Sequence, residues 1–106
     1  MDIDGPFCPT RMTRDTMLEV RQRLASFESM TWGEIGSTGS HPIPVSDLSA
    51  DAQRRLGEIR QDDVEQLYSL RVSGTERVFG IREGGVLRIL WWDPSHQVAP
   101  TAMKHT

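Results

Sequence analysis

The sequence predicts an α+β fold, in which two N-terminal helices pack on one face of a C-terminal three-stranded antiparallel meander. Three observations support this: apolar residues recur at helical spacing over residues 13–29, they do so again over residues 46–59, and three β-rich runs joined by short turns fill residues 67–92. A chain of 106 residues has the size of one domain. We therefore expect a single α+β domain over residues 13–98, preceded by an irregular arm (1–12) and followed by a C-terminal tail (99–106).

The arm holds two prolines and one glycine in twelve residues and shows no regular spacing, which is typical of irregular structure. Helical periodicity starts after Thr13, whose hydroxyl suits a helix N-cap. The predicted helix ends near Ser29. Its apolar face consists of Met17, Val20, Leu24 and Phe27.

Residues 30–45 contain three glycines and two prolines, so we expect a loop there. The second helix follows, with either Ser46 or Ser49 as its N-cap. Gly57 weakens this helix by about 1 kcal/mol relative to alanine. Its apolar face consists of Leu48, Ala52, Leu56 and Ile59.

The meander is predicted from the runs 67–72, 77–82 and 86–92. Its second turn has two possible lengths. A two-residue loop, Gly84-Gly85, places Ile81 opposite Arg88, whereas a three-residue loop starting at Glu83 places Arg82 opposite Val86. We favour the three-residue loop because it gathers the large apolar side chains on one face. These side chains are Phe79, Ile81, Leu87, Ile89 and Trp91.

The opposite face of the predicted meander carries Arg71, Arg82 and Arg88, together with Trp92 and the small Gly80. Because both helices are expected to cover the other face, this one is expected to remain open. Arginines on an open sheet face are often only its solvated side. The alternative is a surface that binds phosphate groups, for which guanidinium geometry is well suited.

Composition restricts the classes of function. The formal net charge is −3, with 12 Lys+Arg against 15 Asp+Glu, so binding of nucleic acid through bulk positive charge is not expected. The single cysteine, Cys8, and the absence of a long apolar run predict a cytoplasmic protein that does not associate with membranes. Cys8, His41, His96 and His105 are too scattered to predict a metal site. We expect no cofactor.

The segment WWDPSH (91–96) is the most unusual of the chain. Asp93-Pro94 predicts a sharp turn in which the Asp93 carboxylate accepts hydrogen bonds. His96 carries an imidazole, which exchanges protons near neutral pH. Cleavage of RNA without a metal needs a base, an acid and cations around the phosphate. His96 could move the protons, Arg71, Arg82 and Arg88 could supply the charge, and a base could stack on Trp92 or Tyr68.

Two helices followed by the strands LYSLRV, RVFGIR and VLRILWW resemble the core of the RelE/ParE-like toxins. Residues 67–98 are also similar to small bacterial proteins that end in a WWDP-x-H tail. The resemblance implies messenger-RNA cleavage by a bacterial toxin–antitoxin system. It also implies that Arg71, Arg77 and Arg82 bind phosphate, that His96 is the terminal acid or base, and that a cognate antitoxin or other small protein is the partner.

Two hypotheses follow. The first is a toxin-like protein that acts on RNA, either as a metal-independent endoribonuclease or as an RNA binder. In this hypothesis His96, Arg82 and Arg71 are catalytic, and Arg77, Arg88, Trp92 and Tyr68 bind substrate. It requires the guanidinium groups to lie together on the open face near His96. The alternative is a non-enzymatic interaction module that uses Trp32, Trp91 and Trp92 as anchors.

Overall fold

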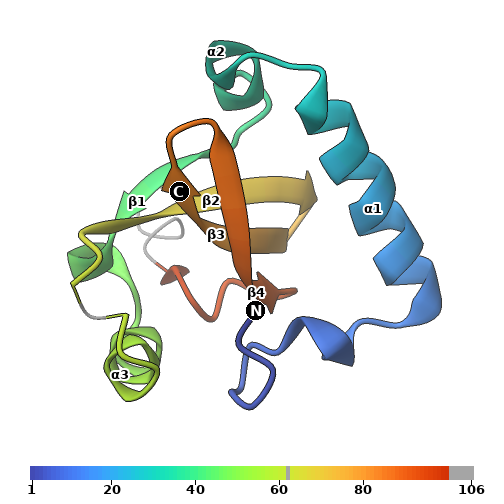
Figure 1. The fold of residues 1–106 in the computed structure, drawn as a ribbon. Coiled ribbons are helices and arrows are strands. Elements are labelled where there is room, and N and C mark those ends of the chain that lie inside the picture. The colour runs from blue at the N-terminus through green and yellow to red at the C-terminus, as the bar shows by residue number, and fades with distance from the viewer. Residues whose placement is uncertain (62, 101–106) are drawn as a thin grey trace.

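A computed structural model describes residues 1–61 and 63–100 (Figure 1). The fold is α+β, as expected, with a four-stranded antiparallel sheet in the order β1-β2-β3-β4. Most of the predicted tail, residues 101–106, lies outside the described residues, as does Asp62. The elements in chain order are η1 (Pro9–Arg11), α1 (Arg14–Glu28), α2 (Trp32–Gly36), β1 (His41–Pro44), η2 (Val45–Asp47), α3 (Ala50–Glu58), β2 (Gln66–Ser73), β3 (Glu76–Glu83) and β4 (Val86–Asp93).

The first predicted helix is α1, and its N-cap is confirmed. The Thr13 hydroxyl accepts a hydrogen bond from the Thr16 backbone N–H at 3.2 Å. Val20 and Phe27 are buried against the sheet, whereas Met17, on the same predicted face, is 50% exposed. The helix therefore packs on the sheet from Val20 onward.

The predicted loop 30–45 contains two elements that we did not expect. Thr31 and Glu34 form a reciprocal capping box that begins α2, a single helical turn. Residues 41–44 form β1, which pairs antiparallel with residues 66–69 of β2. The expected count of three strands is thus wrong. Two prolines in four residues argue against a strand in general, but an edge strand tolerates them because only one of its sides is paired.

The helices cover both faces of the sheet, contrary to the expectation that they share one (Figure 1). One core, here called the α1-side core, lies between α1, α2 and the sheet. The other, the α3-side core, lies between α3, the N-terminal arm and the sheet. The α1-side core includes Val20, Phe27, Ile35, Tyr68, Leu70, Val72 and Val78. The α3-side core includes Phe7, Leu56, Leu67, Phe79, Ile81, Leu90, Trp91 and Val98.

The second turn of the meander is the two-residue version, contrary to our expectation. Glu83 pairs with Val86 across Gly84-Gly85, and Ile81 pairs with Arg88. A β-bulge interrupts the register between Phe79 and Gly80, so that Phe79 faces Trp91. Because both sheet faces are buried, the apolar side chains of β4 divide between two cores: Leu87 and Ile89 pack on the α1 side, and Leu90 and Trp91 on the α3 side.

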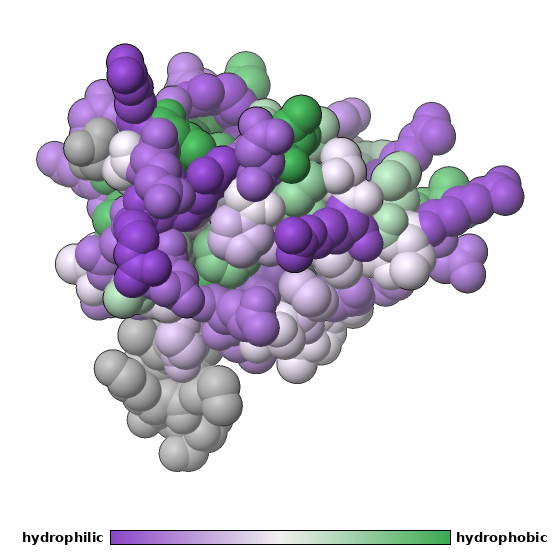
Figure 2. Space-filling model, turned by 90° about the horizontal axis from the view of Figure 1, so that it is seen from below, coloured by the Kyte–Doolittle hydropathy of each residue, from purple (hydrophilic) through white to green (hydrophobic). Residues whose placement is uncertain are grey.

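The N-terminal arm is part of the folded body. Phe7 is buried and its ring centroid lies 5.1 Å from that of Trp91. The face seen in Figure 2 is predominantly hydrophilic, with separate apolar patches rather than one continuous apolar surface. Within residues 1–61 and 63–100, no helix combines the length and apolar character needed to cross a bilayer.

Candidate functional site

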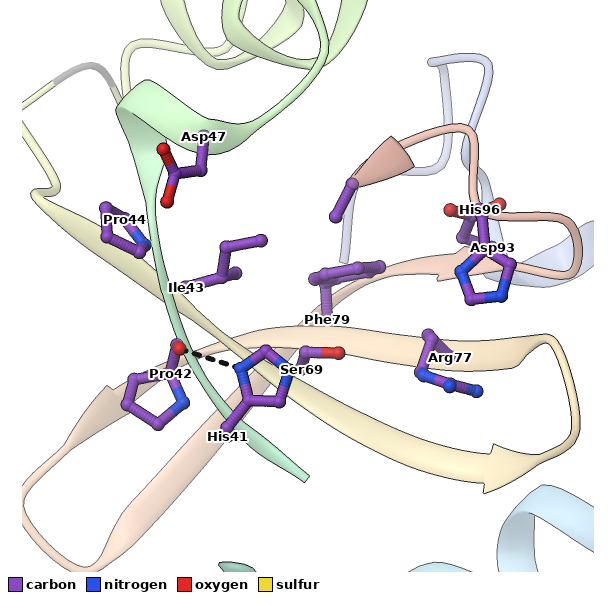
Figure 3. Close-up of a pocket in the computed structure, with 11 residues that line it drawn as sticks. His41, Pro42, Ile43, Pro44, Asp47, Ser69, Arg77, Phe79, Asp93 and His96 are labelled. Carbon is purple, nitrogen blue, oxygen red and sulfur yellow. Dashed lines mark hydrogen bonds between the residues drawn. The ribbon is translucent and has the colours of Figure 1, made fainter. Parts of the chain in front are cut away.

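A cavity of about 450 Å³ opens between the edge strand β1 and the segment that follows β4 (Figure 3). Ile43 and Phe79 contribute apolar surface to it. Its polar side chains come from five separate parts of the chain. They are His41 on β1, Asp47 on η2, Ser69 on β2, Arg77 on β3, and Asp93 and His96 at the end of β4.

The turn after β4 places His96 at this cavity. Asp93 is fully buried, and its carboxylate accepts hydrogen bonds from the backbone N–H groups of Ser95 at 3.1 Å and Val98 at 2.8 Å. The Thr75 hydroxyl donates to the Pro94 carbonyl at 2.7 Å, which attaches the turn to the β2–β3 hairpin. The predicted role of Asp93 as the acceptor of a tight turn is confirmed.

His96 itself has a φ of +58°, in the left-handed region that side chains rarely adopt. Such a conformation costs on the order of 1 kcal/mol or more and persists where the surroundings enforce it. Here the hydrogen bonds from the Ser95 and Val98 N–H groups to the Asp93 carboxylate fix the backbone on both sides of His96. The fold thus holds a strained residue beside the cavity.

Arg77 is held on the same side of the sheet. Its Nη1 donates to the carbonyls of Gly74 at 2.7 Å and Glu76 at 3.0 Å. Burial lowers the pKa of Arg77, and the positive charge of Arg71 lowers it further, while Asp93 partly opposes both effects. Arg71 is the direct cross-strand neighbour of Arg77. Like charges directly opposite are unfavourable, so an anion bound near the pair would relieve their repulsion.

His41 lines the same cavity as Arg77, from the edge strand β1. Its Nδ1 lies 2.9 Å from the Pro42 carbonyl oxygen (Figure 3). An Nδ1–H that donates to this carbonyl leaves Nε2 as the acceptor, which is the form a general base requires. Ser69, the cross-strand neighbour of His41, adds a hydroxyl to the cavity.

The structure gathers only part of the predicted site. His96 and Arg77 line the cavity, and Arg71 lies beside Arg77. The predicted common face of Arg71, Arg82 and Arg88 is wrong. Arg82 lies on the α1 side with its guanidinium 4.0 Å from the Trp32 ring centroid, whereas Arg88 lies on the α3 side and pairs with Glu83 at 3.0 Å. Successive residues of one strand point to opposite faces of the sheet, and the length of the turn between β3 and β4 decides which residues of the two strands share a face.

The predicted aromatic residues also lie away from the cavity. Tyr68 is buried in the α1-side core, where Trp92 is half-buried against it. Trp91 is fully buried, so it cannot act as the exposed anchor of an interaction module.

Sequence analysis missed His41, Ser69 and Asp47 as site residues. The sequence predicts a loop at His41, whereas in the structure this residue lies on β1 and lines the cavity beside β2. The four residues His41-Pro42-Ile43-Pro44, with one apolar side chain between two prolines, carry no local signal that is sufficient to predict this strand.

Within the described parts of the chain, no group of three or more His, Cys, Asp or Glu side chains is arranged to hold a metal ion. No family model, no curated protein and no solved structure matches the chain. The fold and cavity define the class only as a small α+β domain with a histidine- and arginine-lined site, and its function is inferred from that geometry.

Proposed function

We propose that the protein is a toxin-like endoribonuclease that works without a metal, with its active site in the cavity between β1 and the turn after β4. The shared face of Arg71, Arg82 and Arg88 that the sequence-based hypothesis required is absent. The proposal therefore rests on a different observation: two imidazoles, His41 and His96, and the guanidinium of Arg77 line the same cavity. Two imidazoles can act as the base and the acid of a phosphodiester cleavage, and a guanidinium can stabilise its charge.

In the proposed reaction, His41 accepts the proton of a ribose 2′-hydroxyl, whose oxygen attacks the neighbouring phosphorus. The bond from phosphorus to the 5′ oxygen breaks, and protonated His96 donates a proton to that leaving oxygen. The products are a 2′,3′-cyclic phosphate and a 5′-hydroxyl. Arg77 and Arg71 offset the extra negative charge that the phosphorane carries in the transition state.

The pair of cations formed by Arg71 and Arg77 explains how an acidic protein can bind a polyanion. The net charge of −3 provides no long-range attraction for RNA. The attraction must therefore be local, and in the described residues neither Arg71 nor Arg77 forms a salt bridge with a carboxylate. A phosphate between them would form hydrogen bonds to charged donors in a partly desolvated setting.

Burial argues against the tryptophan anchors of the interaction-module alternative, because Trp91 is inaccessible and Trp32 and Trp92 are half-buried. Exposed apolar side chains remain on α1, where Met17 is 50% exposed and Leu18 is 47% exposed. These residues favour contact with a protein partner. Such contact does not distinguish the two hypotheses, because the toxin hypothesis also includes a protein partner, the antitoxin.

A cleavage assay tests the proposal. Purified protein is incubated with an RNA and with a DNA of the same sequence in the presence of EDTA. We expect cleavage of RNA alone, with cyclic-phosphate ends, and a loss of rate of about 100-fold or more in His96→Ala and in Arg77→Ala. Arg88→Ala is the matched control, because Arg88 is an exposed arginine outside the cavity. Equal cleavage of DNA, or full activity in both site variants, contradicts the proposal.

Induced expression in cells gives a second test. We expect growth to stop, and the double variant Arg77→Ala, His96→Ala to restore it while its melting temperature stays close to that of the wild type. A protein that is harmless when expressed alone and that cleaves no RNA in the first assay supports the interaction module instead.

A further inference from the structure

A second hollow lies on the opposite side of β1 from the catalytic cavity, and both are lined by His41 and Pro42. The other residues that line it include Trp32, Tyr68, Arg82 and Gln66. We infer that this hollow is a nucleobase subsite, in which a base of single-stranded RNA stacks on the guanidinium of Arg82. The inference rests on the proposed function, since it takes the adjoining cavity as the phosphate site.

The aromatic side chains form a layered support for Arg82. The ring centroids of Tyr68 and Trp32 are 5.1 Å apart, and the Arg82 guanidinium carbon lies 4.0 Å from the Trp32 centroid. Tyr68 is buried and Trp32 half-buried, whereas Arg82 is exposed. The outer face of the guanidinium is therefore available, and stacking of bases on arginine planes is a common mode of single-stranded RNA recognition.

The short helix α2 holds Trp32 rigidly. Trp32 is its first residue, directly after the Thr31 N-cap, and the capping box joins Thr31 to Glu34 in both directions at 3.0 and 3.2 Å. Ile35, in the same turn, is buried in the α1-side core. A platform for stacking needs this kind of fixed position, because an already ordered side chain loses little freedom when the base binds.

Two glycines border the hollow at positions where the backbone conformation does not require glycine. Gly33 and Gly36 line it, and neither has a left-handed φ. A Cβ atom at Gly36 would meet nothing within 4 Å, and one at Gly33 would make only an ordinary contact with Thr31 at 3.8 Å. Glycine is a poor helix former, so larger side chains here would suit α2 better and would extend into open space.

Direct binding measurements test the subsite. The probes are a 2′-O-methyl RNA hexamer, which cannot be cleaved, and an abasic hexamer of the same sugar and phosphate groups. We expect the wild type to bind the RNA at least tenfold more tightly than the abasic probe, because stacking of a base on an aromatic side chain contributes roughly 5- to 150-fold and the guanidinium plane stacks bases in the same way. Arg82→Ala should remove this preference and leave the affinity for the abasic probe unchanged within about twofold.

Further variants separate stacking from charge and from misfolding. Arg82→Lys keeps the charge but not the plane, so we expect it to lose the preference as Arg82→Ala does. Gly36→Leu should fill the hollow and weaken RNA binding without lowering the melting temperature. Arg88→Ala, an exposed arginine on the other side of the sheet, should behave as the wild type.

The outcomes separate a failure of the base subsite from a failure of the proposed function. If the wild type binds both probes equally, or if Arg82→Ala keeps the preference for bases, the subsite is wrong and the phosphate site stands. If the wild type binds neither probe, both the subsite and the proposed function are wrong. If Arg77→Ala weakens both probes while Arg82→Ala weakens only the RNA, both are supported.

Discussion

The Asp2 carboxylate connects the N-terminal arm to the core, and its removal is the most direct test of the structure. Its two oxygens accept hydrogen bonds from Arg55 at 2.7 and 2.8 Å and from the indole N–H of Trp91 at 2.8 Å. The Asp2 side chain is 3% exposed, and Trp91 is fully buried. Asp2→Ala therefore leaves the indole N–H without a partner inside the protein.

The magnitude follows from these contacts. A buried donor without an acceptor costs about 1–3 kcal/mol, and a hydrogen bond to a charged group contributes about 1.5–3 kcal/mol. These contributions are not additive, since the variant also gives up the desolvation cost of the carboxylate. We expect Asp2→Ala to lower the free energy of unfolding by about 3 kcal/mol. Asp2→Asn, which keeps an acceptor oxygen, should lose less.

The effect should depend on pH in one direction. The pKa of Asp2 lies below its ordinary value of 3.8. The hydrogen bonds from Arg55 have the largest effect, burial partly opposes them, and the hydrogen bond from Trp91 lowers the pKa further. A carboxyl group whose pKa is lower in the folded state stabilises the protein above its unfolded-state pKa, and this stabilisation disappears as the pH falls through the folded-state value. The difference between wild type and Asp2→Ala should thus be constant from about pH 7 to 5 and shrink below about pH 4.

Urea unfolding followed by tryptophan fluorescence at several pH values measures both effects. Asp4→Ala is the control, because Asp4 is exposed in the same arm and should change stability by no more than about 0.5 kcal/mol. If Asp2→Ala is as stable as Asp4→Ala at pH 7, the arm is not held to the core as described.

Three further predictions concern the sheet and the site. Gly80→Ala should destabilise the fold by about 1–3 kcal/mol, because the added Cβ would lie 2.7 Å from the Arg88 carbonyl oxygen and 3.0 Å from the Leu87 side chain. Thermal unfolding measures this loss of stability. An unchanged midpoint would contradict the bulged register. His96→Gly should relieve the left-handed strain, so that the stability measured by calorimetry is equal to that of the wild type or higher by up to about 1 kcal/mol. The same variant should lose RNA cleavage. A large loss of stability would instead indicate a structural role for the His96 side chain. The logarithm of RNA affinity should fall with the logarithm of salt concentration with a slope of about −1.4, as expected for two phosphate contacts to a single strand; a slope beyond about −4 would require a basic surface larger than the Arg71–Arg77 pair.

Local signals were sufficient to predict α1, α3 and the three long strands of the meander. The Thr13 cap with the spacing of Val20 and Phe27 defined α1, and the glycine-containing turns defined the three long strands. The Asp93 turn was also predictable, because an aspartate before proline restricts the backbone in a specific way. These features depend on neighbours in sequence, which a single chain displays directly.

The site was only partly predictable because it depends on register and on a long-range pairing. Strand β1 is too short and too rich in proline to be recognised without its partner β2, so His41 was placed in a loop. The bulge in β4 cannot be seen in the sequence, and it decides which side chains share a face. The wrong turn length put Arg82 and Arg88 on one face, and the assumption that this face is open made them a predicted cluster. Arg77 and His96 were nevertheless among the predicted residues and do line one cavity.

Both borders of the sheet are occupied in ways that limit how another chain can attach. Along β4, the arm supplies the hydrogen bonds Asp2 N–H to Leu90 O at 3.1 Å and Trp92 N–H to Phe7 O at 3.0 Å. Along β1, Pro42 and Pro44 have no N–H to offer to an incoming strand. The end of β4 around Leu90 and Trp92 and the proline positions of β1 are therefore poor templates for strand addition, which limits edge-to-edge aggregation along these stretches. A protein partner must instead recognise side chains, and the exposed apolar residues of α1 are available for that contact.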